Sequence, residues 1–214
     1  YRVIASIKSD EDYLLLNTKD EINDLKEIYT DKGWRFISYI SDKANKVNLI
    51  EGGKMCRVMY LSTHGKSFGD LYFTKILLRG DDKRLKWYNM IELLEEGSIF
   101  EGVEEVNISA CEVGSGLVGK GDGGGMAWGF MLGGVRRVVL SYWPVEVKSS
   151  ENVLYIYHKK LLEGKDSYEA LREAKIELRG KLDEIRESCY RSWYSKCENY
   201  KSPFFWGSFT IWGR

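Results

Sequence analysis

Apolar residues along this chain follow two patterns: short continuous runs and longer stretches with helical spacing. The short runs predict strands at residues 2–7, 35–40, 57–62, 105–110 and 137–143. Helical spacing predicts helices at residues 19–29, 89–96, 126–132, 150–163 and 167–187. Because strands alternate with helices, we expect an α/β fold with a mostly parallel sheet between two layers of helices.

Two further segments add to this expected sheet. Residues 71–78 and 85–88 flank the polar turn 79–82, a pattern typical of a β-hairpin. Aromatic residues dominate residues 204–212 and predict a final strand whose tryptophans belong to the core. A length of 214 residues fits one domain spanning residues 1–214.

Composition excludes several classes of function. The chain has 32 basic and 32 acidic residues, so no basic excess indicates a nucleic-acid partner. No apolar run approaches the roughly 20 residues that span a bilayer, and no signal peptide is visible. The chain starts at Tyr1 and soon enters a strand-like run, so we expect it to be a domain of a longer protein or a processed chain.

The cysteines have no metal-ligand spacing, and we expect neither a metal nor a cofactor. They stand at Cys56, Cys111, Cys189 and Cys197. A disulfide between Cys189 and Cys197 is one alternative. In a chain without secretory signals, free thiols in a reducing cytoplasm are the default expectation.

A thiol and an imidazole each follow a predicted buried strand. His64 comes just after residues 57–62, and Cys111 directly follows residues 105–110. The carboxyl ends of parallel strands meet at one edge of a sheet, so adjacent strands would bring both side chains together. A cysteine attacks as thiolate and needs a base or a positive neighbour. The pair therefore indicates nucleophilic catalysis, with the backbone N–H groups of Gly65 and Cys111 as a candidate oxyanion hole.

Each of these features also has an ordinary structural explanation. A lone buried cysteine is most often a small apolar residue, and a histidine at a strand end is more often structural than catalytic. The glycine-rich residues 114–125 lack the Ser or Thr that a phosphate-binding loop requires after Gly-Lys. We therefore expect a mobile loop there, facing the substrate or simply lying on the surface. His158, within a helical pattern, is expected to be solvated or to serve in packing.

Five segments together resemble the CHAT domain, a caspase-like module related to separases and caspases. YLSTHG at 60–65 resembles its histidine motif, and NISACEVG at 107–114 resembles its cysteine motif. RVVLSYWPV at 137–145 resembles the strand that ends in a Trp-Pro-Val sequence. SPFFWGSFTIWG at 202–213 resembles its terminal motif, and SYEALREAK at 167–175 resembles its Ala-Leu-Arg-Glu-Ala helix. The resemblance covers nearly the whole chain.

This resemblance implies a caspase-like three-layer sandwich with a six-stranded, mostly parallel sheet and a catalytic dyad of His64 and Cys111. It also implies that Trp143 and Glu146 shape the substrate pocket. The family often has two acidic residues at this point, whereas Val147 follows Glu146 here, so a preference for a basic residue before the cut is weakened.

The leading hypothesis is a cytoplasmic cysteine endopeptidase that cleaves a protein substrate. By resemblance it is held inactive until a regulatory domain, partner protein or ligand activates it, and it serves in defence or stress responses. The alternative is a non-catalytic module of the same fold that acts as a scaffold. No membrane, nucleic acid, metal or cofactor enters either hypothesis.

Overall fold

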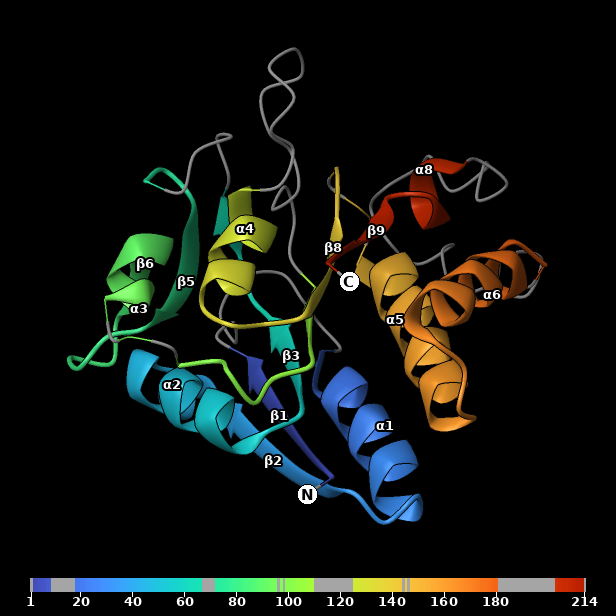
Figure 1. Ribbon diagram of the computed structural model, residues 1–214, viewed down its shortest axis with the longest axis horizontal. Coiled ribbons are helices and arrows are strands. Elements are labelled where there is room, and N and C mark those ends of the chain that lie inside the picture. The colour runs from blue at the N-terminus through green and yellow to red at the C-terminus, as the bar shows by residue number, and fades with distance from the viewer. Residues whose placement is uncertain are drawn as a thin grey trace.

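A central sheet with helices on both faces organises the protein (Figure 1). The computed structural model describes residues 2–8, 18–66, 72–95, 97, 99–109, 125–143, 145, 147–180 and 203–213. In chain order its elements are β1 (Val3–Lys8), α1 (Thr18–Asp31), β2 (Arg35–Ile40), η1 (Ser41–Lys43), α2 (Lys46–Met55), β3 (Val58–Ser62), β4 (Gly65–Lys66), β5 (Lys75–Arg79), β6 (Leu85–Asn89), α3 (Met90–Leu94), β7 (Glu105–Ser109), α4 (Gly125–Leu132), β8 (Arg137–Ser141), α5 (Val147–Leu162), α6 (Ser167–Gly180), α8 (Pro203–Trp206) and β9 (Phe209–Gly213).

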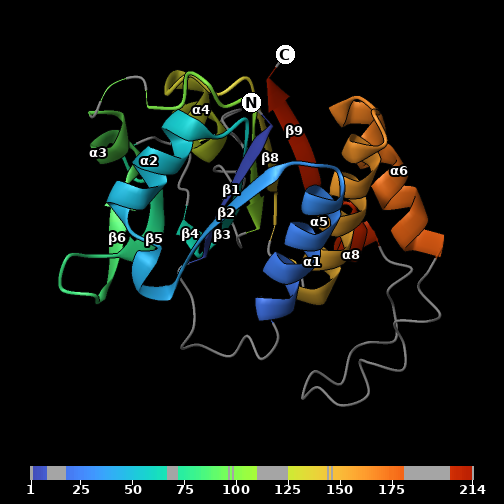
Figure 2. The same cartoon turned by 90° about the horizontal axis from the view of Figure 1, so that it is seen from below.

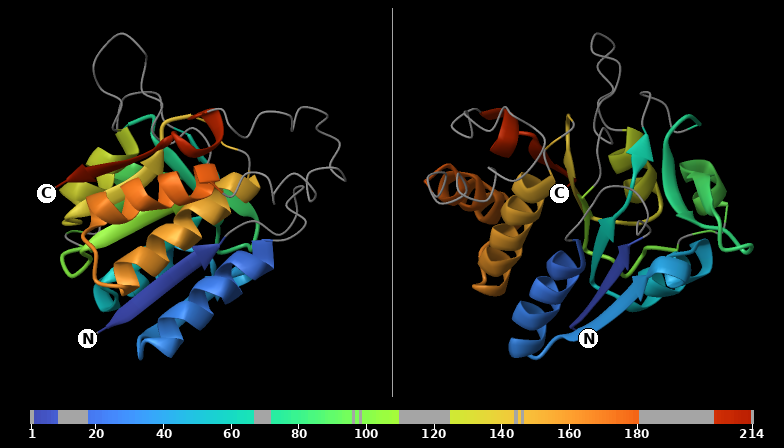
Figure 3. Two further views of the ribbon diagram at one scale, coloured as in Figure 1. Left: turned by 90° about the vertical axis from the view of Figure 1, so that its right-hand side faces the viewer. Right: turned by 180° about the vertical axis from the view of Figure 1, so that it is seen from behind.

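The main sheet has six strands in the order β2-β1-β3-β7-β8-β9. The first five run parallel to one another, and β9 runs antiparallel to β8. As a result, β9 ends on the side of the sheet where β1 and the other parallel strands begin (Figure 3). A smaller antiparallel sheet contains β4, β5 and β6. The expected six-stranded, mostly parallel sheet of a caspase-like sandwich is therefore confirmed.

Two helical layers cover the sheet (Figure 2). Helices α1, α5 and α6 lie on one face, and α2, α3 and α4 lie with the β5–β6 hairpin on the other. Strand β3 shows why its sequence is apolar throughout: Met59 and Leu61 enter one core while Tyr60 enters the other. Successive side chains of a strand point to opposite faces, so a strand covered on both sides needs no polar stripe.

Most predicted elements are present, but the prediction for residues 204–212 is wrong in its first half. Pro203–Trp206 forms the short helix α8, and the strand starts only at Phe209. Gly207 N donates to Pro203 O at 2.6 Å, which closes the turn between helix and strand. Trp206 and Trp212 pack against the two cores as half-buried residues, in agreement with a structural role.

Two predictions extend beyond the described residues, and one helix is present that was not predicted. Residues 181–187 of the predicted last helix and residues 114–124 of the glycine-rich segment lie outside them. Helix α2, which the apolar pattern did not indicate, is present and begins with Asn45 as its N-cap. Within the described part of the chain, no helix is both long and apolar enough to cross a membrane.

Candidate active site at the carboxyl ends of β3 and β7

His64 lies where the chain leaves the main sheet and enters the small one. Thr63 N donates to Ser109 O at 3.3 Å, which extends the contact between β3 and β7 one residue beyond Ser62. On the other side, Leu77 N donates to His64 O at 2.9 Å. The half-buried His64 is therefore fixed through its backbone by hydrogen bonds to both sheets.

The backbone N–H of Gly65 points away from the neighbouring strand. Gly65 is the register partner of Ile76 in the antiparallel pair β4–β5. Hydrogen-bonded and non-hydrogen-bonded pairs alternate along such a ladder. Because Leu77 N bonds to His64 O, the Gly65–Ile76 pair is a non-hydrogen-bonded one, and the Gly65 N–H is not used by β5. This donor lies next to His64 in the chain and faces away from the small sheet.

Ser62 and Ser109 are register partners at the ends of the adjacent parallel strands β3 and β7. Neighbouring strands lie about 4.8 Å apart. Cys111 follows Ser109 by two residues, as His64 follows Ser62. Cys111 itself lies outside the described residues, and so does Glu146. The structure thus brings together the two strands from which the predicted histidine and cysteine motifs continue.

Trp143 follows β8, which is the next strand after β7 at the same edge. Its indole Nε1 donates to Phe204 O at 2.9 Å. The Trp143 and Phe204 rings are stacked, with centroids 6.3 Å apart and an interplanar angle of 24°. The half-buried Trp143 is therefore anchored by α8, an element whose helical form the sequence pattern did not indicate.

The second histidine of the chain is buried and structural. Tyr29 Oη lies 2.7 Å from Nδ1 of His158, and burial lowers the pKa of His158 to about 3. A neutral imidazole that solvent does not reach is no proton-transfer group for a substrate. Of the two roles expected for His158, packing is confirmed and the solvated alternative is wrong, since the side chain is fully buried.

Cys56 is the one cysteine among the described residues, and it is buried. Burial raises the pKa of its thiol to about 12. The thiolate is the nucleophilic form, and it is not populated near neutral pH at such a value. Cys56 is therefore an apolar core residue and no competitor for the role of nucleophile.

A buried carboxyl group beneath this edge escaped the sequence prediction. Glu21 of α1 accepts hydrogen bonds from the Tyr60 hydroxyl and, at 3.2 Å, from Ser62 Oγ. Burial raises the pKa of Glu21 to about 7, and the nearby Glu151 adds to this rise. On an amphipathic helix rich in Lys, Asp and Glu, nothing distinguishes this glutamate from its exposed neighbours.

On the same face of the sheet, Ser109 Oγ lies 3.3 Å from Ser150 Oγ of α5. The ends of β3 and β7 are therefore joined to α1 and α5 by polar contacts below the candidate site. Among the described residues, no three His, Cys, Asp or Glu side chains are grouped so that they could hold a metal ion.

The fold and this edge define a protein of the caspase-like class, which is compatible with a peptidase or a scaffold role. The family comparison is more specific: the chain belongs to the CHAT domain family, whose model matches residues 14–214. The resemblance seen in the five sequence segments is thereby confirmed. No curated protein matches the chain.

Proposed function

We propose that this protein is a cysteine endopeptidase in which Cys111 is the nucleophile and His64 is the proton-transfer group. The observation that carries the proposal is the pairing of Ser62 with Ser109. Each catalytic candidate follows its serine by two residues, a path of about 7.6 Å at most. His64 is also the remaining histidine, since His158 is buried and hydrogen-bonded to Tyr29.

In the proposed reaction the Cys111 thiolate attacks the carbonyl carbon of a peptide bond. His64 takes the thiol proton and then gives it to the departing amine. The acyl-enzyme is hydrolysed by water, which regenerates the thiol. Gly65 supports the oxyanion assignment because its N–H is directed away from β5, and with the N–H of Cys111 it would stabilise the tetrahedral intermediate.

Specificity is assigned to the segment after β8. Trp143, anchored on Phe204, would form one wall of the pocket. Glu146 would supply one negative charge and so favour a basic residue before the cut. A Glu146→Ala variant should lose this preference in a peptide library while its stability stays unchanged. An unaltered cleavage profile would remove Glu146 from the pocket.

In line with the family resemblance, we propose that the peptidase stays inactive until a regulatory domain or partner protein activates it. A test that works without the activator is therefore needed. We would measure the rate of Cys111 alkylation by iodoacetamide against pH, reading each cysteine-containing peptide by mass spectrometry. A nearby imidazolium lowers a thiol pKa, so the Cys111 profile should have its midpoint below the usual value of about 8.5.

The His64→Gln variant should move that midpoint upward, while Cys189 and Cys197 in the same chain serve as internal references. If Cys111 alkylates with the same profile in both proteins, the dyad is excluded. With an activating partner present, Cys111→Ala should abolish cleavage and Cys56→Ala should not. Cleavage that persists in Cys111→Ala would exclude Cys111 as the nucleophile. Absence of cleavage by the activated parent protein would favour the scaffold role.

A further inference from the structure

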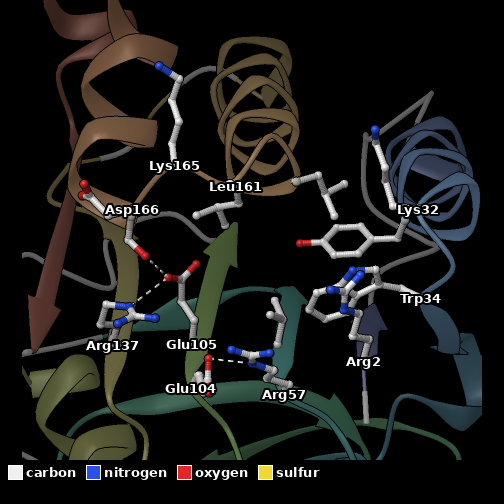
Figure 4. A pocket seen from close by; sticks show the side chains of 15 residues that line it. Arg2, Lys32, Trp34, Arg57, Glu104, Glu105, Arg137, Leu161, Lys165 and Asp166 are labelled. Atoms are coloured by element: carbon white, nitrogen blue, oxygen red, sulfur yellow. Dashed lines mark hydrogen bonds and ion pairs between the residues drawn. The ribbon is translucent and has the colours of Figure 1, made fainter.

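A cavity of about 480 Å³ lies at the opposite edge of the sheet, where the parallel strands begin (Figure 4). Arg2 precedes β1, Trp34 precedes β2 and Arg57 precedes β3, and all three line the cavity. The turn between α5 and α6 and the end of α1 close its other sides. Its volume falls in the range of small-molecule sites, roughly 300–1,000 Å³.

Backbone hydrogen bonds hold the three strand starts in register. Arg35 N donates to Arg2 O at 3.0 Å, and Arg57 N donates to Val3 O at 2.8 Å. Because Val3 is the register partner of Arg35, the residues Trp34 and Arg2 stand side by side at the start of their strands. Trp34 and Arg2 are therefore neighbours, and Arg57 lies at the start of the next strand, beside Val3 and one residue further along β1.

Arg57 is positioned by one carboxylate and keeps its outer nitrogens available. Its Nε lies 2.7 Å from Glu104 Oε2, an ion pair that Figure 4 shows on the cavity wall. Within the described residues, no partner is assigned to the terminal nitrogens of Arg57. Arginine held through one side of its planar group presents the other N–H groups in the arrangement that matches a phosphate.

Arg2 and Lys32 add charge that the cavity itself does not balance. Five cationic and three carboxylate side chains line it. Because Lys165 pairs with Glu173 from outside the cavity, an excess of one positive charge remains. Arg2 and Lys32 have no acidic partner in the described part of the chain. The excess charge favours an anionic ligand over a neutral or cationic one.

An aromatic wall adjoins this charge. Trp34 packs edge-on against the buried Tyr29, with ring centroids 5.2 Å apart and an interplanar angle of 80°. Trp34 itself is half-buried, so part of its indole faces the cavity. An indole fixed by such a contact offers a flat apolar surface for a planar ring.

We propose that this cavity binds a small organic phosphate, with its planar ring against Trp34 and its phosphate on Arg2 and Arg57. The site is separate from the candidate active site. His64 follows Arg57 by seven residues, a span of about 23 Å along an extended strand. The inference concerns a second site and does not depend on the proposed peptidase activity.

The test is calorimetric titration with three probes: adenosine monophosphate, inorganic phosphate and adenosine. The first carries both the ring and the anion, and each of the others carries one of them. Adenosine monophosphate should bind about tenfold more tightly than either of the others, since both halves of the site contribute. The Cys111→Ala variant should bind it equally well, which separates this result from the fate of the peptidase proposal.

Arg2→Ala and Arg57→Gln should each weaken binding of adenosine monophosphate by about tenfold, as loss of a charged hydrogen bond to phosphate does. The matched control is Arg136→Gln. Arg136 Nη1 lies 4.0 Å from the same Glu104, yet it does not line the cavity. Arg2 is exposed, and its side chain forms no hydrogen bond or ion pair with another described residue, so Arg2→Ala is expected to fold even if Arg57→Gln does not.

Trp34→Leu should weaken the binding of adenosine monophosphate and leave the binding of inorganic phosphate unchanged. The proposal is overturned if inorganic phosphate binds as tightly as adenosine monophosphate. It is also overturned if Arg136→Gln weakens binding as much as Arg2→Ala, or if no heat of binding is detected for the parent protein.

Discussion

Tyr29 of α1 and His158 of α5 meet in the interior, with Tyr29 Oη 2.7 Å from His158 Nδ1. The His158 ring also lies edge-on to Tyr60 and Tyr157. Burial keeps the imidazole neutral, so Nδ1 either accepts from the Tyr29 hydroxyl or donates to it, according to the tautomer of the ring. This contact ties the two helices together and removes one of the chain's two histidines from consideration as a catalyst.

His158→Phe should lower the free energy of unfolding by about 1–3 kcal/mol, because the buried Tyr29 hydroxyl loses its hydrogen-bond partner. Adding Tyr29→Phe should cost less than it does in the parent protein, since no unpaired hydroxyl remains. Urea denaturation of the two single variants and the double variant measures the coupling. Strictly additive losses would show that the hydrogen bond does not contribute.

Glu21 makes stability depend on pH. Its pKa is about 7 in the folded protein and 4.5 as the ordinary value. The folded state therefore holds a proton that the unfolded chain has released between these values. Below pH 4.5, Glu21 makes its full contribution to the free energy of unfolding. As the pH rises from 4.5 through about 7, this contribution is lost, and the free energy of unfolding falls by about 3 kcal/mol. The charged groups facing it are Glu151, which strengthens the shift, and Lys8, which opposes it.

Glu21→Gln should remove this loss, so that the variant gains stability relative to the parent above pH 7 and not below pH 4.5. Urea denaturation at several pH values between those limits is the measurement. The matched control is Glu27→Gln, an exposed glutamate on the same helix, which should keep the parent's slope. An unchanged slope in Glu21→Gln would contradict the assignment.

Glu105 is a buried carboxylate that holds several elements together. It accepts hydrogen bonds from Tyr157 at 2.7 Å, Ser167 at 2.6 Å and Asn107 at 3.2 Å. Arg137 Nε lies 3.3 Å from the same carboxylate. Glu105→Gln places an amide N–H₂ against some of these donors, so we expect a loss of about 2–4 kcal/mol in the free energy of unfolding.

Its neighbour Glu104 provides the control. Glu104 pairs with Arg57 at 2.7 Å, but this ion pair is partly exposed. Glu104→Gln should cost about 1 kcal/mol or less, as exposed ion pairs do. The comparison uses urea denaturation of both variants, and equal losses would mean that the burial of Glu105 is not what makes its contacts important.

Gly53 of α2 permits a close approach between a helix and a turn. A Cβ at this position would lie 2.7 Å from Phe100 Cδ1 and 2.9 Å from Ile99 O. Gly53→Ala should lower the free energy of unfolding by about 1–3 kcal/mol, although alanine is the better helix former. No described residue would lie within 4 Å of a Cβ on Gly180 of α6, so Gly180→Ala should be neutral or stabilising by up to about 1 kcal/mol. Thermal unfolding of both variants is the measurement. Equal shifts of the melting temperature in the two variants would contradict the packing argument.

Helix α2 shows why the apolar pattern was not sufficient. Two adjacent glycines, Gly52 and Gly53, interrupt its sequence, and glycine costs about 1 kcal/mol relative to alanine in a helix. The structure accepts that cost because a Cβ on Gly52 would lie 3.3 Å from Ala5 Cβ, on the sheet. The neighbour that demands the glycine is 47 residues away in the sequence, so local reasoning does not find it.

Residues 204–212 illustrate the opposite error. Their aromatic character is typical of a strand, yet Pro203–Trp206 turns as a helix and places Phe204 against Trp143. Similarly, the sequence does not distinguish Glu21 from its exposed neighbours on α1, and its burial becomes evident only when α1 packs on the sheet. A residue's burial depends on which elements pack together, and no local spacing records that.

The sequence by itself determined the alternation of strands and helices, the histidine and cysteine motifs and the family to which they belong. These follow from local periodicity and from residues that stand close together in the chain. Only the tertiary structure decided that β3 and β7 are neighbours, with Ser62 opposite Ser109. It also decided that His158 is buried against Tyr29, and that Arg2, Trp34 and Arg57 line one cavity. Strand order and packing depend on contacts between distant segments, and these are fixed by the whole core at once.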